Sequence, residues 1–159
     1  MNPLPADPIL TCADSLAFEK SFFKGDDERE WQVMNQAGES IGDSLLRDMR
    51  ELRTIPPRPR ILVLVGKGHN GGDALLAAKR MLRTIPTARA VVWPLCSWDE
   101  CRPHTQRART ELLELAAKRI EEMSPASEAD GIDSLRKTLV QQSGERGFDA
   151  SIDGLLGMQ

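Results

Sequence analysis

The spacing of hydrophobic residues changes along this chain, from the period of a helix near the N-terminus to short unbroken runs further on. Between residues 31 and 52, apolar side chains recur every three or four positions, which is typical of an amphipathic helix. The later runs Ile61–Val65 and Ala90–Leu95 contain no charged residue, as strands buried on both faces do. Stretches of helical period separate and follow these runs. The pattern therefore predicts an α/β fold with a parallel sheet.

The whole chain, residues 1–159, is predicted to form a single domain with three parts. Three prolines favour an extended arm over residues 1–10, and N-terminal helices occupy residues 11–53. A sheet core then spans residues 60–159. Besides the two strands named above, the predicted elements of this core are a helix from Ala74 to Leu82, a helix from Pro103 to about Ala117, a short strand within Lys118–Met123, a helix from Gly131 to Gln142, and a last strand from Phe148 to Ile152.

Helical spacing also predicts which side chains of the helices are buried. The inward positions are Leu16, Ala17 and Phe23 in the first helix, Val33, Met34, Ala37, Ile41, Leu45, Leu46 and Met49 in the second, Leu112, Leu113 and Leu115–Ala117 after Pro103, and Ile132, Leu135, Leu139 and Val140 in the last. Gly38 and Gly42 lie on the second stripe, where close packing would compensate for their poor helix propensity. His104 is expected to be an exposed residue at a helix start.

The turn after the first strand is unusually rich in glycine, with four glycines in the eight residues Gly66–Asp73. Such a turn lets the backbone approach a ligand closely, and the helix that follows presents unpaired N–H groups that favour phosphate. Gly66, Gly68 and Gly71 match G-x-G-x-x-G, but the ribose-binding acid expected after the second strand is missing or displaced. The lysine of a P-loop is absent as well. A plain tight turn with a capping residue stays open as an alternative.

Three segments together resemble a known family. The central one, Val65–Arg80, is similar to the signature of the NAD(P)H-hydrate epimerase family, also called the YjeF N-terminal domain. Trp31–Glu39 is similar to a helix start of that family, and Asp149–Gly157 is similar to the end of one of its strands. The order and separations agree, so the resemblance covers nearly the whole chain. It implies a three-layer Rossmann-like α/β/α fold with a mainly parallel sheet.

The resemblance also implies an activity and a site. Members of the family interconvert the R and S forms of hydrated NADH and NADPH, so we expect an isomerase that binds these nucleotides. The residues that match the family's substrate contacts are His69, Asn70, Gly71, Gly72, Asp73 and Gly157. Asn70 and Asp153 match positions that bind a potassium ion (K+), a hard cation that takes oxygen ligands. The catalytic acid and base stay unassigned. A homodimer and a functional link to an NAD(P)H-hydrate dehydratase are also expected.

This chain departs from the family pattern at several positions. His69 stands in place of the family's first asparagine, and Ala74 stands in place of a glycine. The family places a further aspartate and a hydroxyl ligand beyond the position of Gly157, whereas this sequence ends at Gln159. We therefore expect a sheet that is incomplete at its C-terminal end. A non-catalytic binding or dimerisation module and an inactive truncated fragment are the alternatives.

Charge and composition narrow the range of partners. The net charge is -3 and the basic residues are spread along the chain, so nothing predicts a nucleic-acid surface. No apolar run is long enough to span a membrane and no signal peptide is visible, which predicts a cytoplasmic location. Cys12, Cys96 and Cys101 lack C-x-x-C spacing. Cys96 and Cys101 are close enough to share a local site, although reduced cytosolic thiols are the favoured interpretation.

Overall fold

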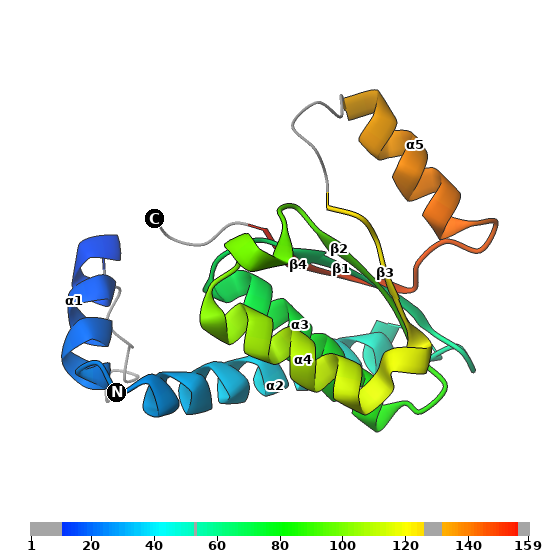
Figure 1. Ribbon diagram of the computed structural model, residues 1–159. Helices are drawn as coiled ribbons and strands as arrows, with labels where there is room; N and C mark the ends of the chain where they lie inside the picture. The colour runs from blue at the N-terminus through cyan, green and yellow to red at the C-terminus, as the bar shows by residue number, and fades with distance from the viewer. Residues whose placement is uncertain (1–10, 53, 126–131, 156–159) are drawn as a thin grey trace.

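The computed structural model describes residues 11–52, 54–125 and 132–155. Within these residues the elements are, in chain order, α1 Cys12–Phe23, α2 Asp27–Leu52, β1 Arg60–Val65, α3 His69–Thr84, β2 Arg89–Pro94, η1 Trp98–Glu100, α4 Pro103–Ala116, η2 Ala117–Arg119, β3 Ile120–Glu122, α5 Ile132–Ser143 and β4 Ala150–Gly154. The strands form one parallel sheet in the order β3-β2-β1-β4. α2, α3 and α4 lie on one side of this sheet, and α5 stands over the other (Figure 1). The predicted α/β/α fold is therefore confirmed.

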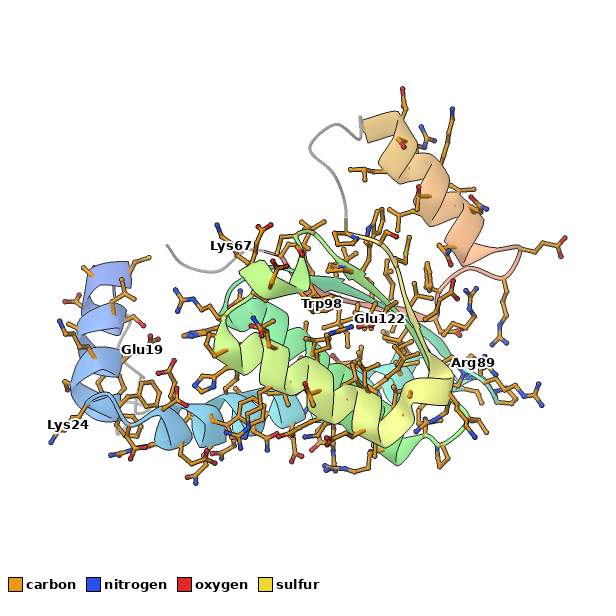
Figure 2. All side chains as sticks on the ribbon, viewed as in Figure 1. Glu19, Lys24, Lys67, Arg89, Trp98 and Glu122 are labelled. Carbon is orange, nitrogen blue, oxygen red and sulfur yellow. The ribbon has the colours of Figure 1, made fainter. Side chains whose placement is uncertain are left out.

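β1 lies at the centre of the sheet and organises the core. It pairs with β2 on one side and with β4 on the other, and Ile61, Val63 and Val65 are completely buried. These side chains belong to one apolar cluster with the inward face of α3. Figure 2 shows Lys67, just after β1, and Arg89, at the start of β2, at opposite ends of the sheet. The carboxyl edge of the sheet is thus the edge near Lys67.

α2 packs closely against α3 through two glycines. A Cβ atom at Gly42 would lie 2.9 Å from the carbonyl oxygen of Ala77, and one at Gly38 would collide with the side chain of Leu76. Both glycines are buried. Their lack of a side chain lets the two helices approach, which confirms the close packing that the sequence predicts. No helix in the described ranges is both long and apolar enough to cross a lipid bilayer.

Some side chains that helical spacing places inward are exposed instead. They are Leu16 and Ala17 of α1, Val33, Ala37 and Ile41 of α2, Leu115 and Ala117 near the end of α4, and Val140 of α5. α1 buries none of its residues. The period of an apolar stripe shows that a helix has an apolar face, but not how much of that face its neighbours cover. On α2, α3 covers the narrower side that contains Gly38 and Gly42.

His104 is buried, contrary to the prediction, with only 6% of its surface exposed. α2 begins at Asp27, one helical turn before the predicted start at Trp31. This extra turn reaches the start of α4, where Asp27 lies beside His104. The imidazole also packs against the Trp31 ring at a centroid distance of 5.7 Å. His104 Nε2 lies 3.3 Å from Asp27 Oδ1, without the alignment of a hydrogen bond.

We expect Gly38→Ala to lower the free energy of unfolding by about 1–2 kcal/mol, because the new methyl group would press against α3. In an exposed helix the same change would stabilise by about 1 kcal/mol. Ala37→Gly, at the exposed neighbouring position, calibrates helix propensity alone and should cost about 1 kcal/mol. Urea unfolding of both variants measures these differences. A Gly38→Ala protein more stable than the wild type would contradict the close helix contact.

Candidate functional site

The carboxyl edge of the sheet brings two predicted site segments next to each other. In the register of β1 and β4, Leu64 faces Asp153 and Val65 faces Gly154. The N–H of Gly66 then donates to the carbonyl oxygen of Gly154 at 3.0 Å. The glycine-rich turn and the end of β4 are therefore bonded neighbours, although they are far apart in sequence.

The turn itself is shorter than the sequence predicts. α3 begins at His69 and not at Ala74, so only Gly66–Gly68 separate β1 from the helix. A Cβ atom at Gly154 would lie 2.7 Å from the Cβ of Ala74, and one at Gly71 would collide with the carbonyl oxygen of Gly66. Glycine is a poor helix former, yet here its small size lets the first turn of α3 pack directly against the ends of both strands.

The predicted site residues occupy different depths at this edge. Asn70 is exposed, Gly71 and Gly72 are buried, and Asp73 is half-buried. Burial raises the pKa of the Asp73 carboxyl from 3.8 to about 6. Gly157 lies outside the described residues. The structure thus places His69–Asp73 on the first helical turns and not in an open loop.

Asp153 lies within β4 and not just beyond it, because the strand runs to Gly154. Its side chain is exposed, and one carboxylate oxygen, Oδ1, accepts the N–H of Leu155 at 2.9 Å. Ile152 and Gly154 are buried on the α3 side. Since successive side chains of a strand alternate between faces, Asp153 projects from the opposite face, the one over which α5 stands.

The hollows beneath α5 open on this same face of the sheet. One, of about 550 Å³, is lined by Leu62, Phe148 and Ser151 among others. Another, of about 350 Å³, is lined by Trp93, Met123 and Leu135 among others. In the register of the sheet, Ser151 and Asp153 share a face, so the Asp153 carboxylate projects from the face on which the space next to Leu62 opens.

His69 joins three elements at the start of α3. Its Nε2 lies 3.1 Å from Glu30 Oε1 on α2 and 3.0 Å from a guanidinium nitrogen of Arg102, just before α4. Burial and the positive charge of Arg102 lower the pKa of the imidazole, and Glu30 opposes them. A neutral imidazole is therefore favoured near pH 7.

Residues before and within α4 also hold the turn, and sequence reasoning did not identify them. The N–H of Arg102 donates to the carbonyl oxygen of Lys67 at 2.9 Å. The buried hydroxyl of Thr105 donates to the carbonyl oxygen of Gly68, also at 2.9 Å. No motif marks these residues. Their position after β2 is the only signal, because segments after parallel strands meet at one edge.

Comparison with known proteins identifies the family of this chain. A family model described as the N-terminus of YjeF-related proteins matches residues 30–159. The chain belongs to the YjeF N-terminal family. The crystal structure of yeast YNL200c is similar to this YjeF N-terminal domain, with a TM-score of 0.68 and 18% sequence identity. The match covers 96% of this chain and 58% of the yeast chain, and at this identity it shows the shared fold. A search of curated protein sequences gives no significant match.

In this YjeF N-terminal domain, the raised pKa of Asp73 predicts a pH-dependent stability cost. The folded state holds the proton up to about pH 6, whereas the unfolded chain loses it near pH 4. Stability attributable to Asp73 therefore falls as pH rises from about 4 to 6. The full shift corresponds to about 3 kcal/mol, and partial exposure of the carboxyl reduces this to about 1–2 kcal/mol.

Asp73→Asn should accordingly raise the free energy of unfolding by about 1–2 kcal/mol at pH 7 and by almost nothing at pH 4. Urea unfolding at the two pH values measures the effect. Asp133→Asn, at an exposed position in the first turn of α5, is the matched control and should show no such gain. Equal effects of Asp73→Asn at both pH values would disprove the raised pKa.

Proposed function

We propose that this YjeF N-terminal domain takes part in interconverting the R and S forms of hydrated NADH and NADPH. The observation that supports this most is the contact between the first turn of α3 and the end of β4, which carries Asp153. In open parallel sheets, ligands bind beyond the carboxyl ends of the strands. Membership of the family makes nicotinamide nucleotide repair the reaction class that we favour.

The first turn of α3 would bind the phosphates of the nucleotide. The N–H groups there carry the positive end of the helix dipole. Arg102, in contact with His69, adds a positive charge beside them. His69 and Asn70 would donate side-chain hydrogen bonds. Asp73, with a pKa of about 6, can exchange a proton near neutral pH.

Asn70 and Asp153 would hold the potassium ion. Both side chains are exposed, and amide and carboxylate oxygens are the ligands that a hard cation takes. The N–H of Leu155 occupies one oxygen of Asp153, which leaves the other for a cation. When bound, the ion would neutralise negative charge beside the substrate. Among the described residues, no three His, Cys, Asp or Glu side chains cluster as a metal site.

A role in dimerisation is the second proposal that the surface supports. Leu16 and Phe18 of α1 expose half or more of their surface, and Val33 and Ile41 of α2 are exposed too. Contiguous exposed apolar patches are typical of protein contacts, and we propose that these side chains belong to one. A homodimer would be compatible with the epimerase proposal. A link to an NAD(P)H-hydrate dehydratase is proposed only because both proteins would act on the same hydrated nucleotide.

Asp153→Asn is expected to slow exchange between the R and S forms of hydrated NADPH by at least about tenfold, because it removes the charge that would face the cation. The exchange is followed by NMR at a fixed potassium concentration. Asp133→Asn, the same change at an exposed position on α5, should leave the rate unchanged. Circular dichroism checks that both variants fold.

Two results would contradict this account in different ways. Exchange at the wild-type rate in the folded Asp153→Asn variant would remove Asp153 from the site and leave the activity itself standing. A wild-type chain that does not accelerate the exchange would refute the epimerase proposal for this chain, and a stable dimer would then favour the binding module.

A further inference from the structure

Two cysteines bracket the short helix η1 between β2 and α4. The Sγ atoms of Cys96 and Cys101 lie 3.8 Å apart. Cys96 is half-buried, whereas only 4% of the surface of Cys101 is exposed. Neither residue has a place in the epimerase site proposed above.

The segment between the two cysteines is held in a closed turn. The N–H of Glu100 donates to the carbonyl oxygen of Ser97 at 3.1 Å. The N–H of Cys101 donates to the carbonyl oxygen of Trp98 at 3.2 Å. The guanidinium of Arg109 stacks on the Trp98 ring at 4.5 Å and pairs with Glu122 at 2.6 Å. Figure 2 shows Trp98 and Glu122 close together. The backbone thus keeps the two thiols facing each other.

We propose that Cys96 and Cys101 are a redox modification site, at which a small-molecule disulfide such as oxidised glutathione converts the two thiols into an intramolecular disulfide. A disulfide bond is about 2.05 Å long, so the sulfur atoms must approach by less than about 2 Å.

The reaction balances in two exchange steps. The thiolate of Cys96 attacks one sulfur of oxidised glutathione, forms a mixed disulfide and expels a first glutathione thiolate. The thiolate of Cys101 then attacks Cys96 Sγ, forms the internal disulfide and expels the second. The two cysteines lose two electrons, glutathione disulfide gains them, and the two thiol protons pass through solvent to the glutathione thiolates.

The surroundings of the thiols set the order of these steps. Burial, and then the neighbouring Cys96, raise the pKa of the Cys101 thiol to about 12, so Cys101 is a poor first nucleophile. Cys96 is the more accessible thiol. Once Cys96 is in the mixed disulfide its thiol group is gone, so its contribution to the raised pKa of Cys101 disappears, whereas that of burial remains.

The disulfide would cross-link a segment that holds the glycine-rich turn. Just before Cys96, the N–H of Leu95 donates to the carbonyl oxygen of Val65 at 2.9 Å. Just after Cys101, the N–H of Arg102 donates to the carbonyl oxygen of Lys67, also at 2.9 Å. Oxidation would therefore covalently link the residues next to Leu95 and Arg102, the two points at which the β2–α4 segment is bonded to the end of β1 and the turn after it. Formation of the bond does not depend on the proposed epimerase activity.

The test equilibrates the chain carrying Cys12→Ser in buffers with increasing ratios of oxidised to reduced glutathione. After an acid quench, remaining thiols are alkylated and the protein is digested with trypsin. Both cysteines fall on one peptide, 90–107, because trypsin cleaves after Arg89 and Arg107 but not between Arg102 and Pro103. Mass spectrometry should detect a form of this peptide that is two hydrogens lighter than the reduced peptide and carries no alkyl group. The fraction of peptide in this form should rise with the ratio of oxidised to reduced glutathione until it is the major form.

Single variants and the native chain supply the controls. Cys101→Ser should trap glutathione on Cys96, whereas Cys96→Ser should leave Cys101 unmodified under the same conditions. In the unmutated chain, the exposed Cys12 reports that the buffer is oxidising, and this measurement needs no variant to fold. The proposal would be overturned if both thiols of peptide 90–107 stay reduced in a buffer that modifies Cys12. It would also be overturned if the Cys96→Ser variant traps glutathione on Cys101 while the Cys101→Ser variant traps none on Cys96.

Discussion

Close contact between the first turn of α3 and the ends of β1 and β4 determines the arrangement of the candidate site. Gly66, Gly71 and Gly154 have no side chains at the points where these backbones meet. A larger residue at Gly71 or Gly154 would push the helix away from the strand ends, and one at Gly66 would press against the end of β4. Because the helix can pack here, its N–H groups and positive dipole end lie at the carboxyl edge of the sheet. The chemistry that we propose depends on this placement.

The same constraint extends outward from the sheet. Gly38 and Gly42 let α2 pack closely against α3. Glu30, near the start of α2, contacts His69. The segment before α4 completes the enclosure, since Arg102 contacts both the turn and the imidazole. Three elements that are distant in sequence therefore position one short turn. Asp73 is half-buried among them, which explains why its carboxyl holds a proton more strongly than usual.

Local sequence predicts the sheet well, because short uncharged runs of branched residues such as Ile61–Val65 are typical of strands buried on both faces. It also predicts that the glycine-rich turn and Asp153 share an edge, since parallel strands end together. It does not predict that α3 begins at His69, because packing against the strands overrides the low helix propensity of glycine. The burial of His104 is likewise missed, since it depends on an extra turn of α2 meeting α4. The roles of Asn70, Asp153 and the cation are still predictions.

A heteronuclear NMR titration of the isotopically labelled chain with hydrated NADPH, in potassium buffer, tests the shared edge most directly. If the first turn of α3 and the end of β4 form one site, the amide signals of residues 69–73 and of Asp153 and Gly154 should shift together. Their shifts should also fit a single dissociation constant. Shifts at only one of the two segments, or shifts confined to residues beneath α5, would contradict the account.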